Sequence, residues 1–391
     1  MWHVLDCSAA WMKEFVSALS GQVETLGWAP ERRWFGWFER WHRVEDVSDP
    51  PMRLCRYPLQ RGYHLRAFGG YAPIRRALLP RLLAFSPDPA GATLVCTSPY
   101  HYPVAEAWKG PKIYYTTDML CEYPGIDRSE IVRAERTIAG LADVVCANSQ
   151  RNADYLVGEA GCPPGKVVVT PNATRESNIL PEPAWLPGDL PSDAAGLPRP
   201  VAGIIGNMAG NVDWLLLQDA IAATPWLHWL FVGPARGSIP VPAAERARKR
   251  VLCEMPNVLA LGPRPYGTRV SYARALDVAV LPYQAGEPTF SGSSARFYDH
   301  LAACRPILAT RAVEELLHKE PLLRLVDSAD DLVAALDSLR SRDFDDGLQE
   351  LRWKASRSET WEARARQMRI RLADEPGRSE ERARLSGQTS C

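Results

Sequence analysis

The sequence predicts two α/β domains, each built on a doubly wound, mostly parallel sheet. Two observations carry this prediction. Short apolar runs of strand length alternate with helical patterns in both halves of the chain, and a proline-rich stretch interrupts the alternation near the middle. The length of 391 residues, with 46% apolar and 24% charged residues, fits two globular cores and excludes a disordered chain.

In the first half, apolar runs predict strands at 2–7, 22–27, 53–58, 92–97, 112–116, 143–147 and 166–170. A helical pattern lies at 129–141, with Ser129 in a position suited to an N-cap. Residues 171–200 hold seven prolines and show no helical or strand period. That composition is typical of a linker.

The alternation restarts after the proline-rich stretch. Strands are expected at 201–206, 228–232, 257–261, 277–282 and 306–310, with helices between them, one near 213–223. We therefore expect a first domain over 1–185, a linker to about 199, and a second domain over 200–350. Residues 374–391 are polar and are expected to be a disordered tail.

Charge and composition narrow the function classes. The formal net charge is zero, so no bulk field attracts nucleic acid, and no apolar run approaches the roughly 20 residues of a membrane-spanning helix. The first residues lack the basic flank and apolar core of a signal peptide. The nine scattered cysteines predict buried reduced thiols in a cytoplasmic protein, with a disulfide framework or a zinc site as the alternatives.

The segment after the expected strand 277–282 carries the clearest chemical pattern. A loop of small polar residues leads to a helix that begins near Ser293 and Ser294, both suited to N-capping. Free amide groups and the helix dipole favour an anion there, and Arg296 adds a charge suited to phosphate. Asp299, three residues on, can accept hydrogen bonds from ribose hydroxyls. The alternative is an ordinary capped helix with a surface Arg296–Asp299 pair.

Gly206 and Asn207 follow the first strand of the second domain. Small residues at this turn let backbone amides approach a diphosphate, which makes the turn a weak counterpart of the glycine-rich dinucleotide loop. The spacing is not GxGxxG, which argues against a nicotinamide site. An ordinary strand–helix turn is the alternative.

Three motifs in order resemble the C-terminal domain of bacterial glycosyltransferases of family four and of the related xanthan glucuronosyltransferase. They are PNV-x-x-LG-x-x-PY over 256–266, DVAVLPY over 277–283, and SS-x-R-x-x-D-x-LAACRPILAT over 293–310. The resemblance implies the GT-B architecture, in which two Rossmann-like domains face a central crevice. It also implies that Arg296 contacts phosphate, that Asp299 binds the ribose, that Tyr283 lies near the nucleotide, and that the backbone from Arg264 to Tyr266 reads the base.

The resemblance extends over most of the chain. Residues 113–118 resemble the family's YY-x-x-D strand end, and residues 141–149 its ADVV-x-A-x-S segment. Residues 359–365 resemble the SWE-x-RA terminal helix, which implies a helix over 351–373 that returns to the first domain. Two positions depart from the family pattern: Ser291 stands where the first of two acids is usual, and Cys304 where glycine is usual.

Asp118 is the expected catalytic residue. It ends an apolar strand of the first domain and matches the catalytic aspartate of the xanthan enzyme, so it would take the proton from an acceptor hydroxyl. An aspartate that caps the next turn is the alternative. His101, which follows the strand 92–97, is the second catalytic candidate, although a lone loop histidine is more often a surface residue.

An aromatic segment lies at 31–43. Trp34, Trp37, Phe38 and Trp41 follow the i, i+3, i+4, i+7 spacing of one helical stripe, with four arginines around them. Such a helix can lie in a lipid interface or contact an acceptor. Packing against the domain core explains the stripe equally well.

The expected function is therefore transfer of a sugar from a nucleoside diphosphate donor, expected to be a uridine one, to a hydroxyl of a bacterial glycan or lipid-linked glycan. No cofactor other than the donor is expected, and no metal, because no DxD motif stands at a strand end. Peripheral contact with the inner face of the cell membrane fits such an acceptor. The rivals are a GT-B sugar-nucleotide epimerase or phosphorylase, and a catalytically inactive GT-B binding protein.

Overall fold

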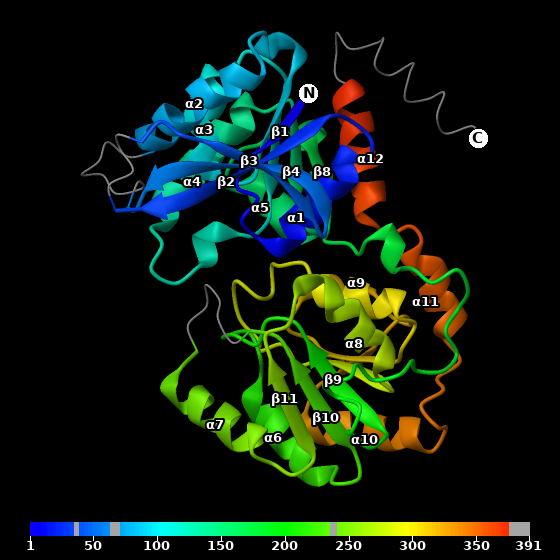
Figure 1. Ribbon diagram of the computed structural model, residues 1–391. Helices are drawn as coiled ribbons and strands as arrows, with labels where there is room; N and C mark the ends of the chain where they lie inside the picture. Colours follow the sequence, from blue (N-terminus) through cyan, green and yellow to red (C-terminus); the bar gives the residue numbers. More distant parts are fainter. Residues whose placement is uncertain (35–38, 63–70, 235–240, 375–391) are drawn as a thin grey trace. The chain divides into compact units, whose positions relative to one another are not determined.

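A computed structural model describes residues 1–34, 39–62, 71–234 and 241–374 (Figure 1). The chain divides into two compact units. Unit 1 comprises Met1–Cys121, Ile126–Pro171 and the chain from Trp361 onward, and unit 2 comprises Glu122–Gly125 and Asn172–Thr360.

Unit 1 holds an eight-stranded sheet in the order β3-β4-β2-β1-β5-β6-β7-β8, in which β3 alone runs antiparallel to its neighbour among the described strands. Its strands are β1 (Trp2–Val4), β2 (Thr25–Arg33), β3 (Arg43–Ser48), β4 (Pro51–Gln60), β5 (Thr93–Cys96), β6 (Lys112–Thr116), β7 (Val144–Ala147) and β8 (Val167–Val169). Its helices are α1 (Ala10–Ser20), α2 (Ala72–Phe85), α3 (Tyr102–Ala107), α4 (Arg128–Leu141), α5 (Gln150–Gly158) and α12 (Trp361–Ala373).

Unit 2 holds a six-stranded parallel sheet in the order β11-β10-β9-β12-β13-β14. Its strands are β9 (Val201–Ile205), β10 (His228–Val232), β11 (Val258–Gly262), β12 (Val278–Leu281), β13 (Ile307–Thr310) and β14 (Arg324–Val326). Its helices are α6 (Trp214–Ala223), α7 (Ala243–Cys253), α8 (Arg269–Ala275), α9 (Ala295–Ala302), α10 (Ala329–Arg340) and α11 (Gln349–Ser356).

Both sheets confirm the predicted fold class of two parallel-sheet α/β domains. Strands β5, β7, β9, β12 and β13 are buried along their whole length. Helices cover both faces of a parallel sheet, so its central strands are continuous apolar runs, which is why the sequence revealed them. The helix expected at 129–141 is α4, but its N-cap is Asp127, whose carboxylate accepts from the Glu130 amide, and not Ser129.

The described residues of the aromatic segment, 31–34 and 39–43, do not form the expected helix. Strand β2 extends to Arg33 and pairs with β4 as far as Gln60, and β3 begins at Arg43. Trp37 and Phe38 lie outside the described residues. Tryptophan and phenylalanine favour strands as well as helices, and the ladder between β2 and β4 supplies backbone hydrogen bonds that a helix would have had to supply locally.

The proline-rich segment belongs to unit 2, whose boundary at Asn172 falls earlier than expected. Side chains of unit 2 bind its backbone along much of its length. The indole nitrogen of Trp353 donates to the Leu180 carbonyl at 2.8 Å, and Arg305 donates to the carbonyls of Ala184 and Trp185. Proline removes backbone donors, so the segment is fixed through its free carbonyl groups.

The helix expected over 351–373 is two helices, α11 in unit 2 and α12 in unit 1. Helix α12 packs on α1. The Trp361 ring is stacked against Trp11 at 6.2 Å, and its indole nitrogen donates to the Glu14 carboxylate at 3.2 Å. A fully buried tryptophan at the first residue of α12 fixes this helix to unit 1.

Eight cysteines lie in the described ranges, all of them free thiols and seven of them buried. Within the same ranges, no three histidine, cysteine or acidic side chains lie close enough together to hold a metal ion. No helix of the described chain has both the length and the apolar character needed to cross a bilayer.

One buried acid of unit 1 makes a pH-dependent prediction. Glu135 accepts hydrogen bonds from the hydroxyls of Tyr114 and Tyr155, and burial, its largest influence, raises its pKa to about 7. The folded state therefore binds this proton more tightly than the unfolded chain. Stability is lost as pH rises from about 4.5 to about 7, by about 3 kcal/mol.

Glu135→Gln, which stays neutral and keeps an acceptor for the tyrosines, is expected to remove this loss. Melting temperatures at pH 5.5 and pH 8 would show it, with the variant gaining on the wild type at the higher pH. Burial lowers the pKa values of His3 and His101 to about 4. Both proteins therefore lose the same amount of stability from these two histidines as pH falls below 6.5. An unchanged difference between variant and wild type across this range would contradict the prediction.

Candidate functional site

The carboxyl edge of the unit 2 sheet contains its topological switch point. From β9 the chain moves outward to β10 and β11, then returns to β12 on the other side of β9. The connections that follow β9 and β12 therefore leave in opposite directions. In open α/β sheets this arrangement opens a crevice in which ligands bind.

Glycines end three neighbouring strands at this edge. Their φ values are 122° at Gly206, 144° at Gly233 and 71° at Gly262. The Gly206 amide donates to the carbonyl of Val232 at the end of β10, and the Gly233 amide donates to the carbonyl of Gly262 at the end of β11. A Cβ at Gly233 would lie 1.9 Å from the Gly206 carbonyl oxygen, and one at Gly206 would lie 2.9 Å from Arg296 Nε. The ends of β9 and β10 are thus packed so closely that only glycine fits at position 233. Asn207 follows with its side chain exposed.

Arg296 lies at the switch point, beside Gly206. Its side chain is buried, its Cζ atom lies 5.1 Å from the Tyr283 ring centre, and its Nη1 atom has no hydrogen-bond partner among the described residues. The same charge helps to lower the pKa of His300, which burial, the larger cause, brings to about 3. A buried guanidinium that no described carboxylate neutralises is suited to binding an anion.

The sheet of unit 1 has its own switch point, between β1 and β5. Asp6, His101 and Asp118 follow three neighbouring strands, β1, β5 and β6. Asp6 adopts a φ of 54°, and His101 is buried with its Nδ1 atom lacking a partner within the described chain. Burial lowers the pKa of His101 to about 4, and the charge of Asp6 opposes that shift.

Asp118 is half-buried, two residues beyond the end of β6. Its backbone carbonyl accepts hydrogen bonds from the Leu120 amide at 3.0 Å and from the Thr116 hydroxyl at 3.1 Å. The backbone of Asp118 thus shapes the turn after β6. The structure places both expected catalytic residues at the carboxyl edge of the same sheet.

Comparison with known proteins gives the fold. The chain is similar to sucrose-phosphate synthase from Thermosynechococcus elongatus, with a TM-score of 0.66 and 16% identity over 94% of this chain and 96% of that one. HepE from Anabaena, solved with UDP and glucose, gives a TM-score of 0.62 and 15% identity over 100% and 99%. The chain has the GT-B fold.

The sequence also matches TuaH of Bacillus subtilis (strain 168), which is described as a glycosyltransferase of teichuronic acid biosynthesis. The two are 23% identical over 171 residues, which is 43% of this chain and 42% of TuaH. The match thus spans less than half of that relative. No family model matches the chain. The resemblance to glycosyltransferases is confirmed.

In this GT-B chain, Asp299 forms a buried ion pair that the sequence did not reveal. Its carboxylate receives Arg269 Nε at 2.6 Å and Nη2 at 3.2 Å, and the Thr174 hydroxyl at 3.2 Å. Arg269 in turn lies over the ring of Tyr266, 3.9 Å from its centre. The expected surface pair between Arg296 and Asp299 is absent from the described contacts, because Arg269 occupies the carboxylate.

The start of α9 is capped as expected by Ser294, whose hydroxyl accepts from the Phe297 amide at 3.3 Å and hydrogen-bonds to Tyr283 Oη at 2.8 Å. The Ser294 amide, however, donates to Glu315 at 3.0 Å. Burial raises the pKa of this glutamate. The sequence could not reveal Glu315, because it reaches the helix start from 21 residues further along the chain.

Two other expected donor residues have internal partners. The Ser293 hydroxyl accepts from the Asn172 amide at 2.9 Å, which ties the proline-rich segment to the start of α9. Arg264 Nε donates to Asp193 at 2.5 Å on the same segment, and its guanidinium also donates to the Leu261 carbonyl. The resemblance assigns base recognition to the backbone from Arg264 to Tyr266, not to the side chain of Arg264.

Trp34 directly follows β2, and Trp41 lies two residues before β3. Trp34 is 68% exposed, and the Trp41 indole nitrogen donates to Glu39 at 2.5 Å. Arginines lie over both rings, Arg61 over Trp34 and Arg33 over Trp41. Core packing therefore does not account for Trp34.

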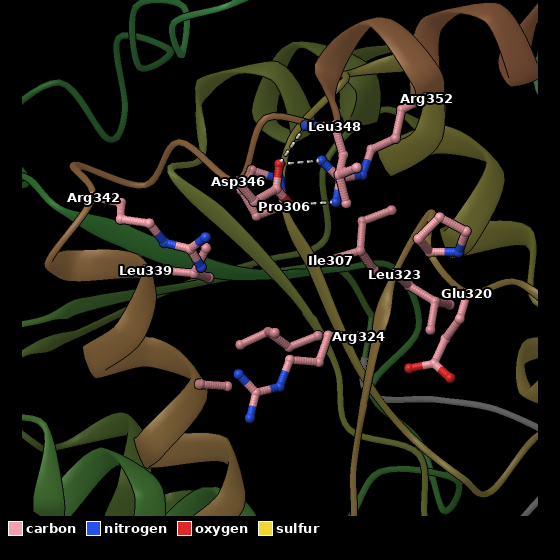
Figure 2. Close-up of a pocket in the computed structure, with 13 residues that line it drawn as sticks. Pro306, Ile307, Glu320, Leu323, Arg324, Leu339, Arg342, Asp346, Leu348 and Arg352 are labelled. Atoms are coloured by element: carbon pink, nitrogen blue, oxygen red, sulfur yellow. Dashed lines mark hydrogen bonds and ion pairs between the residues drawn. The ribbon is translucent and has the colours of Figure 1, made fainter.

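A cavity of about 290 Å³ lies at the opposite edge of the unit 2 sheet (Figure 2). It is lined at the amino ends of β13 and β14 by residues such as Pro306 and Leu323, and it is bounded by the ion pair between Arg352 and Asp346, 2.5 Å apart. Ligands of parallel sheets bind at carboxyl ends, so this cavity is not the expected donor site.

Proposed function

We propose that the chain is a glycosyltransferase that moves a sugar from a uridine diphosphate donor to a hydroxyl of a bacterial glycan or lipid-linked glycan. The observation that carries this proposal is the guanidinium of Arg296 at the switch point, which pairs with no carboxylate of the described residues and lies beside the glycine strand ends. A diphosphate leaving group brings negative charge to such a site. Arg296 and the backbone amide of Asn207 would offset that charge.

The relatives support the class of donor and acceptor. HepE has been solved with UDP and with UDP-glucose, and TuaH is described as a glycosyltransferase of teichuronic acid biosynthesis. Shared fold alone does not transfer function. What adds to it here is a site whose charge fits the UDP that HepE binds.

The expected residues at the two carboxyl edges have roles in this proposal. Asn207 offers its amide to the diphosphate, and Gly206, whose own amide is bonded to β10, leaves room for Arg296 because it has no side chain. Ser294 and Tyr283 support the start of α9 beside it, and Asp299 is directed to the ribose. In unit 1, Asp118 is the general base and His101 the alternative. Catalysis without a metal is part of the proposal, since Arg296 and the Asn207 amide supply the positive charge.

Asp299 can serve a ribose without losing its ion pair. A carboxylate offers about four acceptor positions, and the described contacts use three of them. Asp299→Ala would be a poor test of this role, because it would leave the Arg269 charge buried without its partner.

Ser291 favours a second candidate function, a nucleotide-binding relative that transfers no sugar. The side chain of Ser291 is fully buried, and its hydroxyl donates to the Pro288 carbonyl at 3.2 Å. It therefore cannot replace the acid that similar enzymes carry there. UDP binding without transfer to any acceptor would favour this candidate.

Residence in the cytoplasm and peripheral contact with the membrane complete the proposal. The exposed indole of Trp34, with arginines close by, is suited to the headgroup region of a bilayer. A lipid-linked acceptor would be reached from that position.

Replacing Arg296 with alanine is expected to weaken UDP binding by about 1.5–3 kcal/mol, or about 10- to 150-fold, the loss of a charge-assisted hydrogen bond. Isothermal titration calorimetry with UDP measures it directly. Arg311→Ala is the matched control, because Arg311 follows β13, is exposed and pairs with Asp327 at 2.6 Å. Unchanged UDP affinity in a folded Arg296→Ala variant would remove the observation on which the function rests.

A further inference from the structure

Helix α7 (Ala243–Cys253) presents a strongly basic surface on unit 2. Four basic residues, Arg246, Arg248, Lys249 and Arg250, lie within five positions. The nearby acids are Glu245 and Glu254, and Glu245 is taken by Arg248 at 2.5 Å. The whole chain carries no net charge, so this helix is a local excess of positive charge.

Only a narrow side of helix α7 contacts the rest of unit 2. It packs on α6 and β11, and Leu252 is its one fully buried side chain. Lys249 turns inward, 5.1 Å from the Trp214 ring centre. At 100° per residue the side opposite Leu252 carries Arg246 and Arg250. In Figure 1 this helix lies on the outer side of its unit, beside α6.

The outward side combines arginine with apolar surface. Arg246 and Arg250, four residues apart, are both exposed, and Arg250 has no ion pair or hydrogen bond to any other described residue. Between and beside them lie Ala243, Ala247 and Val251, the last 55% exposed. On the neighbouring α6, Leu215 is 50% exposed.

We propose that this face of α7 docks on an anionic phospholipid surface. Guanidinium groups pair with lipid phosphates, and the alanine and valine side chains enter the headgroup boundary. A soluble polyanion would satisfy the arginines but would leave Val251 and Leu215 in water, so the mixed character of the face favours lipid. The inference concerns recruitment and is independent of the sugar-transfer reaction.

The test is sedimentation with vesicles of phosphatidylcholine alone or with 30% phosphatidylglycerol, using the full chain. We expect binding to the anionic vesicles, release by 0.5 M NaCl, and at least about a 10-fold loss of partitioning in Arg246→Glu/Arg250→Glu, since each basic residue at the surface contributes about a 5-fold effect. Arg53→Glu/Arg133→Glu, which changes the same charge at two exposed arginines of unit 1, should bind nearly as the wild type does.

UDP binding, measured by calorimetry, is expected to be equal in both variants and shows that they are folded. It also shows that a loss of vesicle binding does not come from a damaged donor site. No binding of the wild type to anionic vesicles would overturn it. So would equal binding of the α7 variant, or a loss of binding produced only by Trp34→Ser. Retention on heparin without vesicle binding would reject lipid in favour of a soluble polyanion.

Discussion

Asp118→Asn is expected to lower the rate of sugar transfer by about 100- to 10,000-fold, the contribution of a positioned general base. Asparagine keeps the shape of the side chain but cannot accept a proton at neutral pH. The turn after β6 should persist, because Leu120 and Thr116 bind the backbone carbonyl of residue 118 and not its side chain. Steady-state rates with a saturating UDP-sugar measure the effect.

UDP affinity is the internal control for Asp118, since the expected donor residues belong to unit 2 and should not respond. A near-normal transfer rate in Asp118→Asn would exclude this residue as the base. His101 would then be tested in its place. Burial holds its pKa near 4, so a reaction that depends on neutral His101 should lose activity only below about pH 5.

Gly233→Ala is expected to destabilise unit 2 by at least about 3 kcal/mol. Two costs combine. The φ of 144° is closed to an L side chain, and the added Cβ would lie 1.9 Å from the Gly206 carbonyl oxygen. Because Gly206 adjoins Arg296, the shift needed to relieve the overlap should also weaken UDP binding. Urea unfolding followed by circular dichroism measures the first effect.

Gly196→Ala is the control within the same unit, because a Cβ there would meet no atom within 4 Å and its φ is not positive. It is expected to be neutral or slightly stabilising. Wild-type stability in Gly233→Ala would contradict the prediction. It would mean that the ends of β9 and β10 can move apart at little cost, despite their close packing at the switch point.

The fold class followed from the sequence because its signal is local. A strand covered by helices on both faces must be apolar along its length, as in Val144–Ala147 and Val278–Leu281, and such runs are visible without any tertiary information. The loop from Tyr283 to Ser294 was likewise predictable. A strand, a polar loop and a capped helix succeed one another directly, which places Arg296 at the carboxyl edge of the sheet.

The tertiary structure alone decided which partner each polar group has. Arg269 reaches Asp299 from 30 residues away, Glu315 reaches the Ser294 amide from 21, and neither pairing leaves a trace in local spacing. The same reason explains the aromatic segment: its spacing suits a helix, but Arg33 joins a ladder with Gln60 that a helix would forfeit. Local periodicity determined most elements of this protein. Contacts between distant residues determined the structure of residues 31–33, which charges are neutralised, and which, like that of Arg296, stay available.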